Sequence, residues 1–211
     1  MKYIQLIIPA LAAILLFSCN STQVISSYQD PKVPVKSYNR ILVMGIFQQK
    51  DRAMRQETEN QLASRLKDLG YNAVTAMDEY GPKAFDKIPE DQIADRVKSG
   101  NYDAVITTAL LDKKKAENYQ PGRVSYQPVA VYYNRFGRYY STVYDRVYDP
   151  GYYTTSTDYY LESNLYDGPS GDLVYSVQTK AFDPSSASSL ANDNSKRIVK
   201  DLQSKGILAK K

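Results

Sequence analysis

The sequence predicts a mixed-sheet fold at the border of the α/β and α+β classes, formed by a single domain over residues 39–208. Short apolar runs alternate with amphipathic helical patterns in the first half, which indicates a β-α-β-α-β order with parallel neighbours and right-handed crossovers. The second half is extended up to Asp183 and contains two hairpin patterns, one rich in tyrosine and one around the turn DGPSGD. A last helical pattern closes the domain.

The first strand and helix have clear signatures. The run RILVMGIF at 40–47 is short, apolar and rich in strand formers, as is typical of a buried strand. The segment that follows repeats apolar side chains at helical spacing, and Gly70 supplies its C-terminal cap. The inward positions of this helix are Met54, Thr58, Leu62, Leu66 and Leu69.

Two more strands and one helix complete the first half. The segments YNAVTA at 71–76 and DAVITTALL at 103–111 read as the second and third strands. Between them, a helix begins near Pro89 and stops at Gly100, with Ile93 and Val97 on its inward face.

The last hairpin and the C-terminal helix also have clear sequence signatures. Residues 161–167 and 173–182 alternate with period two on either side of DGPSGD, which predicts an antiparallel pair. One inward face carries Leu161, Ser163 and Leu165, and the other carries Leu173, Tyr175, Val177 and Ala181. The helix runs from about Ser185 to Lys205 and ends at Gly206, and its buried positions are Ala187, Leu190, Ala191, Ile198 and Leu202.

A tyrosine-rich insert occupies about residues 119–160. Thirteen of the 20 tyrosines lie between 119 and 166, whereas the chain has no tryptophan and no histidine. Tyrosine and threonine favour strands, and residues 134–138 form a plausible turn between two alternating segments. The motif Asp149-Pro150-Gly151 ends the second segment.

This insert has three interpretations. It is a hairpin extension whose tyrosines stack across strands, a recognition surface for a protein or a glycan, or a mobile insert that becomes ordered on binding or oligomerisation by strand addition. Its alternation and its place between the first half and the last hairpin favour an ordered extension of the main sheet. The candidate partner-binding residues are Tyr132, Tyr133, Arg135, Arg138, Tyr139, Tyr140, Tyr144, Arg146, Tyr148, Tyr152 and Tyr153.

The N-terminus predicts export. Lys2 precedes an almost unbroken apolar run from Ile4 to Phe17, which has the length of a signal-peptide core and is short for a membrane span. The sequence LFSC at 16–19 resembles the lipobox of bacterial lipoproteins, although Phe17 departs from the usual small residue. This resemblance implies a signal peptide over 1–18 and acylation, for example with palmitate, at Cys19, the only cysteine. The alternatives are a secretory signal with an incidental cysteine and an uncleaved anchor.

Residues 19–38 then read as the acylated cysteine and a flexible tether, because Ser, Thr, Gln and Pro dominate and only Val33–Val35 looks strand-like. A coil of this length reaches on the order of 25 Å, or about 65 Å when stretched. The domain would therefore stand away from the membrane. Asn20, by resemblance to the sorting rule of enteric bacteria, favours the outer membrane, with the domain in the periplasm.

The order of motifs also resembles a family of uncharacterised bacterial envelope lipoproteins with a Tyr-rich insert. The resemblance covers about 40–208 and depends on RILVMGIF, GYNAVTA, SGNYDAVITTALL and LESNLYDGPSGDLVYS. The element order is more loosely similar to the α/β domain of the curli secretion lipoprotein, to the penicillin-binding-protein activator lipoproteins and to the amino-terminal domain of TolB. This resemblance implies a fold and a compartment, and it brings no catalytic residue.

Catalytic chemistry finds little support. Without histidine, Ser-His-Asp and Cys-His machinery and His/Cys zinc sites are excluded, and no cofactor is expected. Ser64 and Lys67 match S-x-x-K by chance, because Leu66 between them is an inward helix position. The acidic pairs Asp145/Asp149 and Asp158/Glu162 leave glycan hydrolysis as a minor alternative.

Nucleic acid is not an expected partner, because the net charge of +4 is modest and the positive residues are dispersed. The cluster Lys113-Lys114-Lys115 reads as a solvated strand end in preference to an anion site. We therefore expect a membrane-anchored, non-enzymatic interaction or assembly module whose partner is an envelope protein or a second copy of itself. The alternative is a lipoprotein that binds peptidoglycan or a surface glycan by aromatic stacking.

Overall fold

The computed structural model describes residues 22–83, 90–120, 124–133, 140–148 and 152–211. The predicted signal peptide and Cys19 lie outside these ranges. The chain divides into two compact units: the residues up to Lys113 together with Asp158–Lys211 form the first, and Lys114–Thr157 forms the second.

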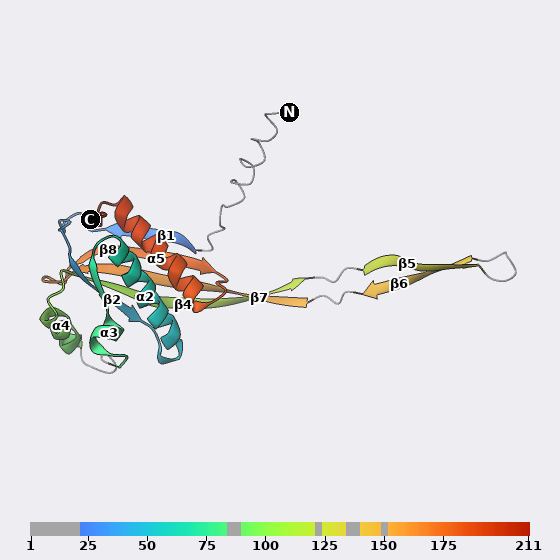
Figure 1. Cartoon of the computed structure of the whole chain (residues 1–211), viewed down its shortest axis with the longest axis horizontal. Coiled ribbons are helices and arrows are strands. Elements are labelled where there is room, and N and C mark those ends of the chain that lie inside the picture. The colour runs from blue at the N-terminus through green and yellow to red at the C-terminus, as the bar shows by residue number, and fades with distance from the viewer. Residues whose placement is uncertain (1–21, 84–89, 121–123, 134–139, 149–151) are drawn as a thin grey trace, which may run out of the picture. The chain divides into compact units, whose positions relative to one another are not determined.

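A six-stranded mixed sheet forms the centre of the first unit (Figure 1). Its strand order is β1-β8-β7-β4-β2-β3. β2 pairs in parallel with both β3 and β4, whereas β8 pairs antiparallel with β7 and β1. This arrangement confirms the predicted fold class and the predicted final hairpin. The strands are β1 (Thr22–Gln29), β2 (Arg40–Ile46), β3 (Asn72–Thr75), β4 (Ala104–Gln120), β7 (Tyr152–Asp167) and β8 (Leu173–Phe182).

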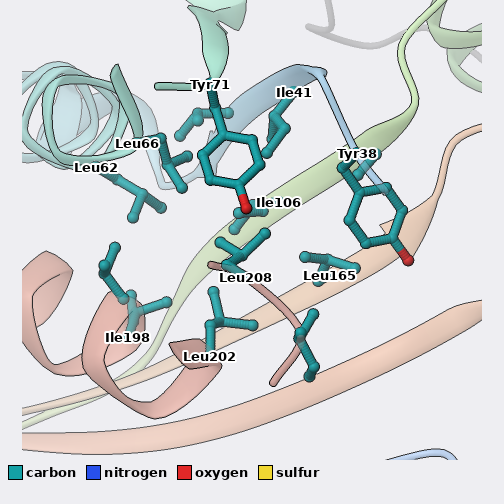
Figure 2. Packing of buried hydrophobic residues seen from close by; sticks show 14 of the residues in the cluster. Tyr38, Ile41, Leu62, Leu66, Tyr71, Ile106, Leu165, Ile198, Leu202 and Leu208 are labelled. Carbon is teal, nitrogen blue, oxygen red and sulfur yellow. The ribbon is translucent and has the colours of Figure 1, made fainter. Parts of the chain in front are cut away.

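Helices cover the sheet on both faces. The helical elements are η1 (Gln49–Asp51), α2 (Arg52–Asp68), α3 (Ala76–Tyr80), α4 (Glu90–Ser99) and α5 (Ala187–Ser204). α2 and α5 lie side by side, and Leu62, Leu66, Ile198 and Leu202 meet strand residues such as Ile106 in one buried cluster (Figure 2). On the other face, the residues that pack together with α3 and α4 are Leu42, Met44, Val74, Ala76, Tyr80, Val97, Tyr102 and Val105.

The structure corrects the prediction for part of the tether. Residues 22–29, expected to be flexible, form β1, an edge strand that pairs with β8 and contains a bulge between Val24 and Ser26. The sequence does not predict this strand, because its inward positions are the polar residues Thr22 and Ser27 instead of an apolar stripe. Ser27 is held through its hydroxyl and Thr22 through its backbone carbonyl oxygen. The stretch Val33–Val35 is not a strand.

Two smaller differences concern the first half of the chain. The third strand was expected to end at Leu111, but β4 continues to Gln120. The short helix α3 was not predicted; its N-cap is Thr75, whose hydroxyl accepts a 3.0 Å hydrogen bond from the backbone N–H of Asp78. A single helical turn is too short to show a periodic apolar pattern.

The second unit contains an antiparallel hairpin of β5 (Val124–Tyr133) and β6 (Tyr140–Tyr148). The two strands form a two-stranded sheet of their own, so the expectation that the tyrosine-rich hairpin extends the main sheet is wrong. The register shifts between Pro128 and Ala130, which marks an irregularity in β5. The predicted turn at 134–138 lies outside the described residues.

Candidate functional site

The hairpin register shows which predicted residues come together. Tyr133 lies opposite Tyr140, Tyr132 lies opposite Ser141, and Tyr126 lies opposite Arg146. Tyr126 is not among the residues predicted from the sequence, although its period-two relation to Tyr132 is a usable signal. The hairpin therefore brings tyrosine opposite tyrosine at one end and tyrosine opposite arginine near the other.

The remaining candidates are distributed among other segments. Tyr144 and Tyr148 lie on β6 opposite Pro128 and Val124. Tyr152 and Tyr153 begin β7. Three predicted residues lie outside the described residues: Arg135, Arg138 and Tyr139.

The two hairpin strands differ in their outer edges. In the described part of the chain, β5 and β6 pair only with each other, so each strand has one edge without a neighbouring strand. β5 contains Pro128 and a register shift, and both features interrupt a regular edge. β6 reads YSTVYDRVY, without proline or glycine, and its pairing is regular. The edge of β6 is therefore the one suited to accept another strand.

β1 is held firmly against α5. The Nε of Arg197 donates a 2.9 Å hydrogen bond to the carbonyl oxygen of Thr22, and the hydroxyl of Ser27 donates to the carboxylate of Asp201. The same carboxylate accepts a 2.7 Å bond from the hydroxyl of Tyr175. Burial, reinforced by the neighbouring Asp201, raises the pKa of Tyr175 above its ordinary value. Thr22 is therefore already an integral part of the main sheet.

The sheet face away from α2 and α5 is only partly covered. Strand alternation places Ile46, Leu111 and Phe182 on this face, and each is more than half exposed. Phe182 lies opposite Asp158 on β7. The carboxylate of Asp158 forms a 2.7 Å ion pair with Lys180, whose Nζ also lies 5.6 Å from the ring centroid of Tyr160. This end of the sheet thus combines apolar groups with a paired charge.

Glu59 is a fully buried carboxylate with a structural role. Its Oε1 accepts hydrogen bonds from the backbone N–H of Gly45 at 2.8 Å and from Nε of Arg55 at 3.0 Å, and its Oε2 accepts from the N–H of Met77 at 2.9 Å. These bonds join β2, α2 and α3. Because both oxygens are engaged, Glu59 is not available for acid–base chemistry.

Asp167 is the second buried carboxylate, at the β7–β8 turn. It accepts hydrogen bonds from Lys36 Nζ at 2.9 Å and from the backbone N–H and hydroxyl of Ser170 at 3.1 and 2.9 Å. Burial alone would raise the pKa of Asp167, but the bonds from Lys36 and Ser170 outweigh it, and the pKa lies below its ordinary value. Sequence patterns predicted the turn but not this contact with Lys36.

The acidic pairs considered for glycan hydrolysis do not form a site in the described residues. Asp158 is paired with Lys180, and the Oε2 of Glu162 accepts a 2.9 Å hydrogen bond from Gln178. Asp145 lies on β6, and Asp149 is outside the described residues. The described part of the chain has no group of three or more His, Cys, Asp or Glu side chains arranged to hold a metal ion.

Two other predicted features can be placed. Leu66 is fully buried on α2 whereas Ser64 and Lys67 are exposed, as the interpretation of S-x-x-K as a chance match requires. The cluster Lys113–Lys115 is exposed as expected, but it lies within β4 and not at a strand end, because β4 continues to Gln120. The Nζ of Lys113 lies 5.0 Å from the ring centroid of Tyr159. Over the ranges that the structure describes, none of the helices is long and apolar enough to cross a membrane.

Comparison with known proteins gives distant structural similarities. No protein-family model matches the sequence, and a search of curated proteins gives no match. The chain is similar to the PelC dodecamer from Paraburkholderia phytofirmans at 14% identity, with 86% of this chain and 97% of that chain covered and a TM-score of 0.45. It is also similar to lipoprotein GNA1162 from Neisseria meningitidis at 15% identity, with 79% and 99% covered and a TM-score of 0.41. Similarities this distant assign neither a family nor a function.

Proposed function

We propose that this chain is a lipid-anchored protein of the bacterial cell envelope, acylated at Cys19, that acts as a non-enzymatic interaction and assembly module. The observation that carries the proposal is the separate two-stranded sheet of β5 and β6. A hairpin of two strands is marginally stable by itself in water and gains stability when a further strand or surface covers it.

The edge of β6 supplies the contact. Alternate residues of this nine-residue strand direct their backbone N–H and C=O groups to the edge that β5 does not cover, where a strand of a protein partner can pair with them. Tyr140, Tyr144 and Tyr148 are separated from one another and from Arg146 by even numbers of positions along this strand. Tyr and Arg are the residue types that dominate the energetics of protein interfaces. The partner is a second copy of the chain or another envelope protein that offers a strand.

The absence of catalytic activity is part of the proposal. The chain has no histidine, and Cys19 is committed to the anchor. The buried carboxylates Glu59 and Asp167 are engaged by backbone groups and cations. The mode of action that we propose for the chain is therefore binding, through surface contacts and strand pairing.

Photo-crosslinking in the native host tests the hairpin as the contact. A photoreactive phenylalanine analogue replaces Tyr144 on β6 in the full-length chain, and Ser64, exposed on α2, serves as the matched control position. We expect a discrete protein adduct from position 144 that is absent from position 64. Equal adduct patterns from both positions, or none from position 144, would contradict the proposal.

The glycan alternative gives a different outcome. Tyr133 opposite Tyr140 offers an aromatic pair on which a sugar ring could stack. If purified chain sediments with isolated peptidoglycan, and Tyr140→Ala and Tyr144→Ala abolish this, the hairpin is a glycan-binding surface. Sedimentation that both variants retain would exclude these side chains from glycan binding.

A further inference from the structure

The folded unit begins very close to the predicted lipid-attachment site. Only Asn20 and Ser21 separate Cys19 from Thr22, the first residue of β1. Three residues span at most about 11 Å, even when fully extended. Thr22 is fully buried, and its carbonyl oxygen is held by Arg197, so β1 cannot lengthen this tether without losing its pairing with β8. The long tether expected from the sequence is therefore replaced by a very short one.

The short tether determines which part of the first unit lies nearest the lipid. Thr22 pairs with Ala181 on β8, and the next residue along β8 is Phe182. Strand spacing and rise place the backbone of Phe182 about 6 Å from that of Thr22. Acyl chains on Cys19 hold that residue at the bilayer interface. Phe182 is therefore within reach of the same interface.

The chemistry around Phe182 fits the boundary between headgroups and acyl chains. The Phe182 side chain is 55% exposed, so transferring it to lipid removes apolar surface from water. Asp158 lies opposite Phe182 on β7, and Lys180 lies two residues before it on the same face of β8. The two charges neutralise each other in a 2.7 Å ion pair. An apolar ring beside a neutralised pair fits a lipid surface without requiring anionic headgroups.

We infer that the end of the six-stranded sheet that carries Thr22 and Phe182 rests on the surface of a phospholipid bilayer, with the Phe182 ring in the interface. The inference rests on the proposed acylation of Cys19. It adds an orientation: the opposite end of the first unit, where Lys36 binds Asp167, points away from the lipid.

A tryptophan reporter tests this orientation. The chain has no tryptophan, so Phe182→Trp and Val35→Trp each introduce a single emitter. Val35 is 42% exposed in the loop beside Lys36, at the end that faces away from the lipid, and is the matched control. Each full-length acylated variant is reconstituted into phosphatidylcholine vesicles with and without brominated acyl chains. Brominated lipid should reduce the emission of Phe182→Trp about twofold, as for a ring at headgroup level, and leave Val35→Trp unchanged.

Equal quenching of the two variants would overturn the inference. A blue-shifted Phe182→Trp emission that brominated lipid does not quench would also overturn it, because the ring would then be buried against protein. The intact mass of the purified chain reports the acylation separately. If Cys19 is unmodified, the proposed anchor fails, and a maleimide-bearing phospholipid coupled to this sole cysteine allows the same comparison to decide the orientation.

Discussion

The hydroxyl of Tyr175 on β8 donates a 2.7 Å hydrogen bond to the carboxylate of Asp201 on α5, beneath the main sheet. Ser27 on β1 donates to the same carboxylate. One helix residue therefore fixes two adjacent strands, and one of them is the strand nearest the predicted lipid anchor.

Tyr175→Phe should lower the free energy of unfolding by about 1.5–3 kcal/mol, because the ring is kept while a buried hydrogen bond to a charged group is lost. Asp201→Ala should lower the free energy of unfolding further, because it leaves the hydroxyl groups of Tyr175 and Ser27 without their acceptor. Urea denaturation followed by circular dichroism measures both. The exposed Gln203→Ala on the same helix should stay within about 0.5 kcal/mol of wild type. A Tyr175→Phe variant as stable as wild type would refute the role of this bond.

The stability of the protein should fall at alkaline pH, in part because of Tyr175. Its pKa in the folded chain is raised above the ordinary 10.0 by burial and by Asp201. The unfolded chain therefore ionises first, and the contribution of Tyr175, fully present below about pH 10, is lost as the pH rises through the folded-state pKa. Unfolding free energies measured between about pH 8 and pH 11 should decline less steeply in Tyr175→Phe. If the unfolding free energies of the wild type and of Tyr175→Phe declined in parallel with pH, Tyr175 would not be the source of this alkaline destabilisation.

Asp167→Asn should destabilise the first unit at neutral pH by about 1–3 kcal/mol, because the buried carboxylate loses the charge that strengthens its hydrogen bonds from Ser170 and from the half-exposed Lys36. The pKa of Asp167 is lowered in the folded chain, so its contribution is present above the ordinary pKa near 3.8 and is lost as the pH falls through the folded value. The difference between variant and wild type should therefore shrink in acid. Denaturant titrations at neutral and acidic pH measure it, with the exposed Asp172→Asn as the control in the same turn.

Gly168→Ala should severely destabilise the β7–β8 turn. A Cβ at Gly168 would lie 1.9 Å from the carbonyl oxygen of Tyr102, a backbone atom that cannot move aside without shifting β4. The Gly168 N–H donates a 2.9 Å hydrogen bond to Asp103, so the close approach is part of the fold. We expect a loss of more than about 3 kcal/mol by thermal or urea unfolding. Gly81→Ala, with a φ of 84° and no atom within 4 Å of the added Cβ, should cost only about 1 kcal/mol.

Replacement of residues 124–148 by a short Gly-Ser turn should leave the first unit folded. Among the residues whose burial the structure describes, the members of the buried clusters all belong to the first unit. The free energy of unfolding should change by less than about 0.5 kcal/mol. Circular dichroism and urea unfolding check this, and loss of a cooperative transition would show that the hairpin supports the sheet.

The apolar elements could be predicted because periodic patterns determine them locally. Leu62 and Leu66 on α2 and Ile198 and Leu202 on α5 are buried as their helical spacing requires. β1 could not be predicted in this way, because the groups that hold it, Asp201 and Arg197, lie more than 170 residues away. No local sequence pattern can indicate a contact between residues so far apart in the chain.

The candidate site was likewise predictable only where local sequence patterns determine it. Alternation of tyrosine with small and β-branched residues was enough to predict the β5–β6 hairpin, and its register places Tyr133 opposite Tyr140. The separation of this hairpin into its own sheet was not predictable, since sheet membership depends on long-range pairing. The burial of Glu59 was also hidden, because a charged residue within a polar helix sequence reads as exposed.

The bulge in β1 has a consequence for solubility. An edge strand with a regular hydrogen-bonding ladder invites other chains to pair and aggregate, and the offset between Val24 and Ser26 disrupts that ladder. The opposite edge of the main sheet is β3, which is only four residues long. With both borders poor templates for intermolecular β-structure, many copies at high local concentration can avoid aggregating through their main sheets, which leaves the edge of β6, the proposed contact, for ordered association.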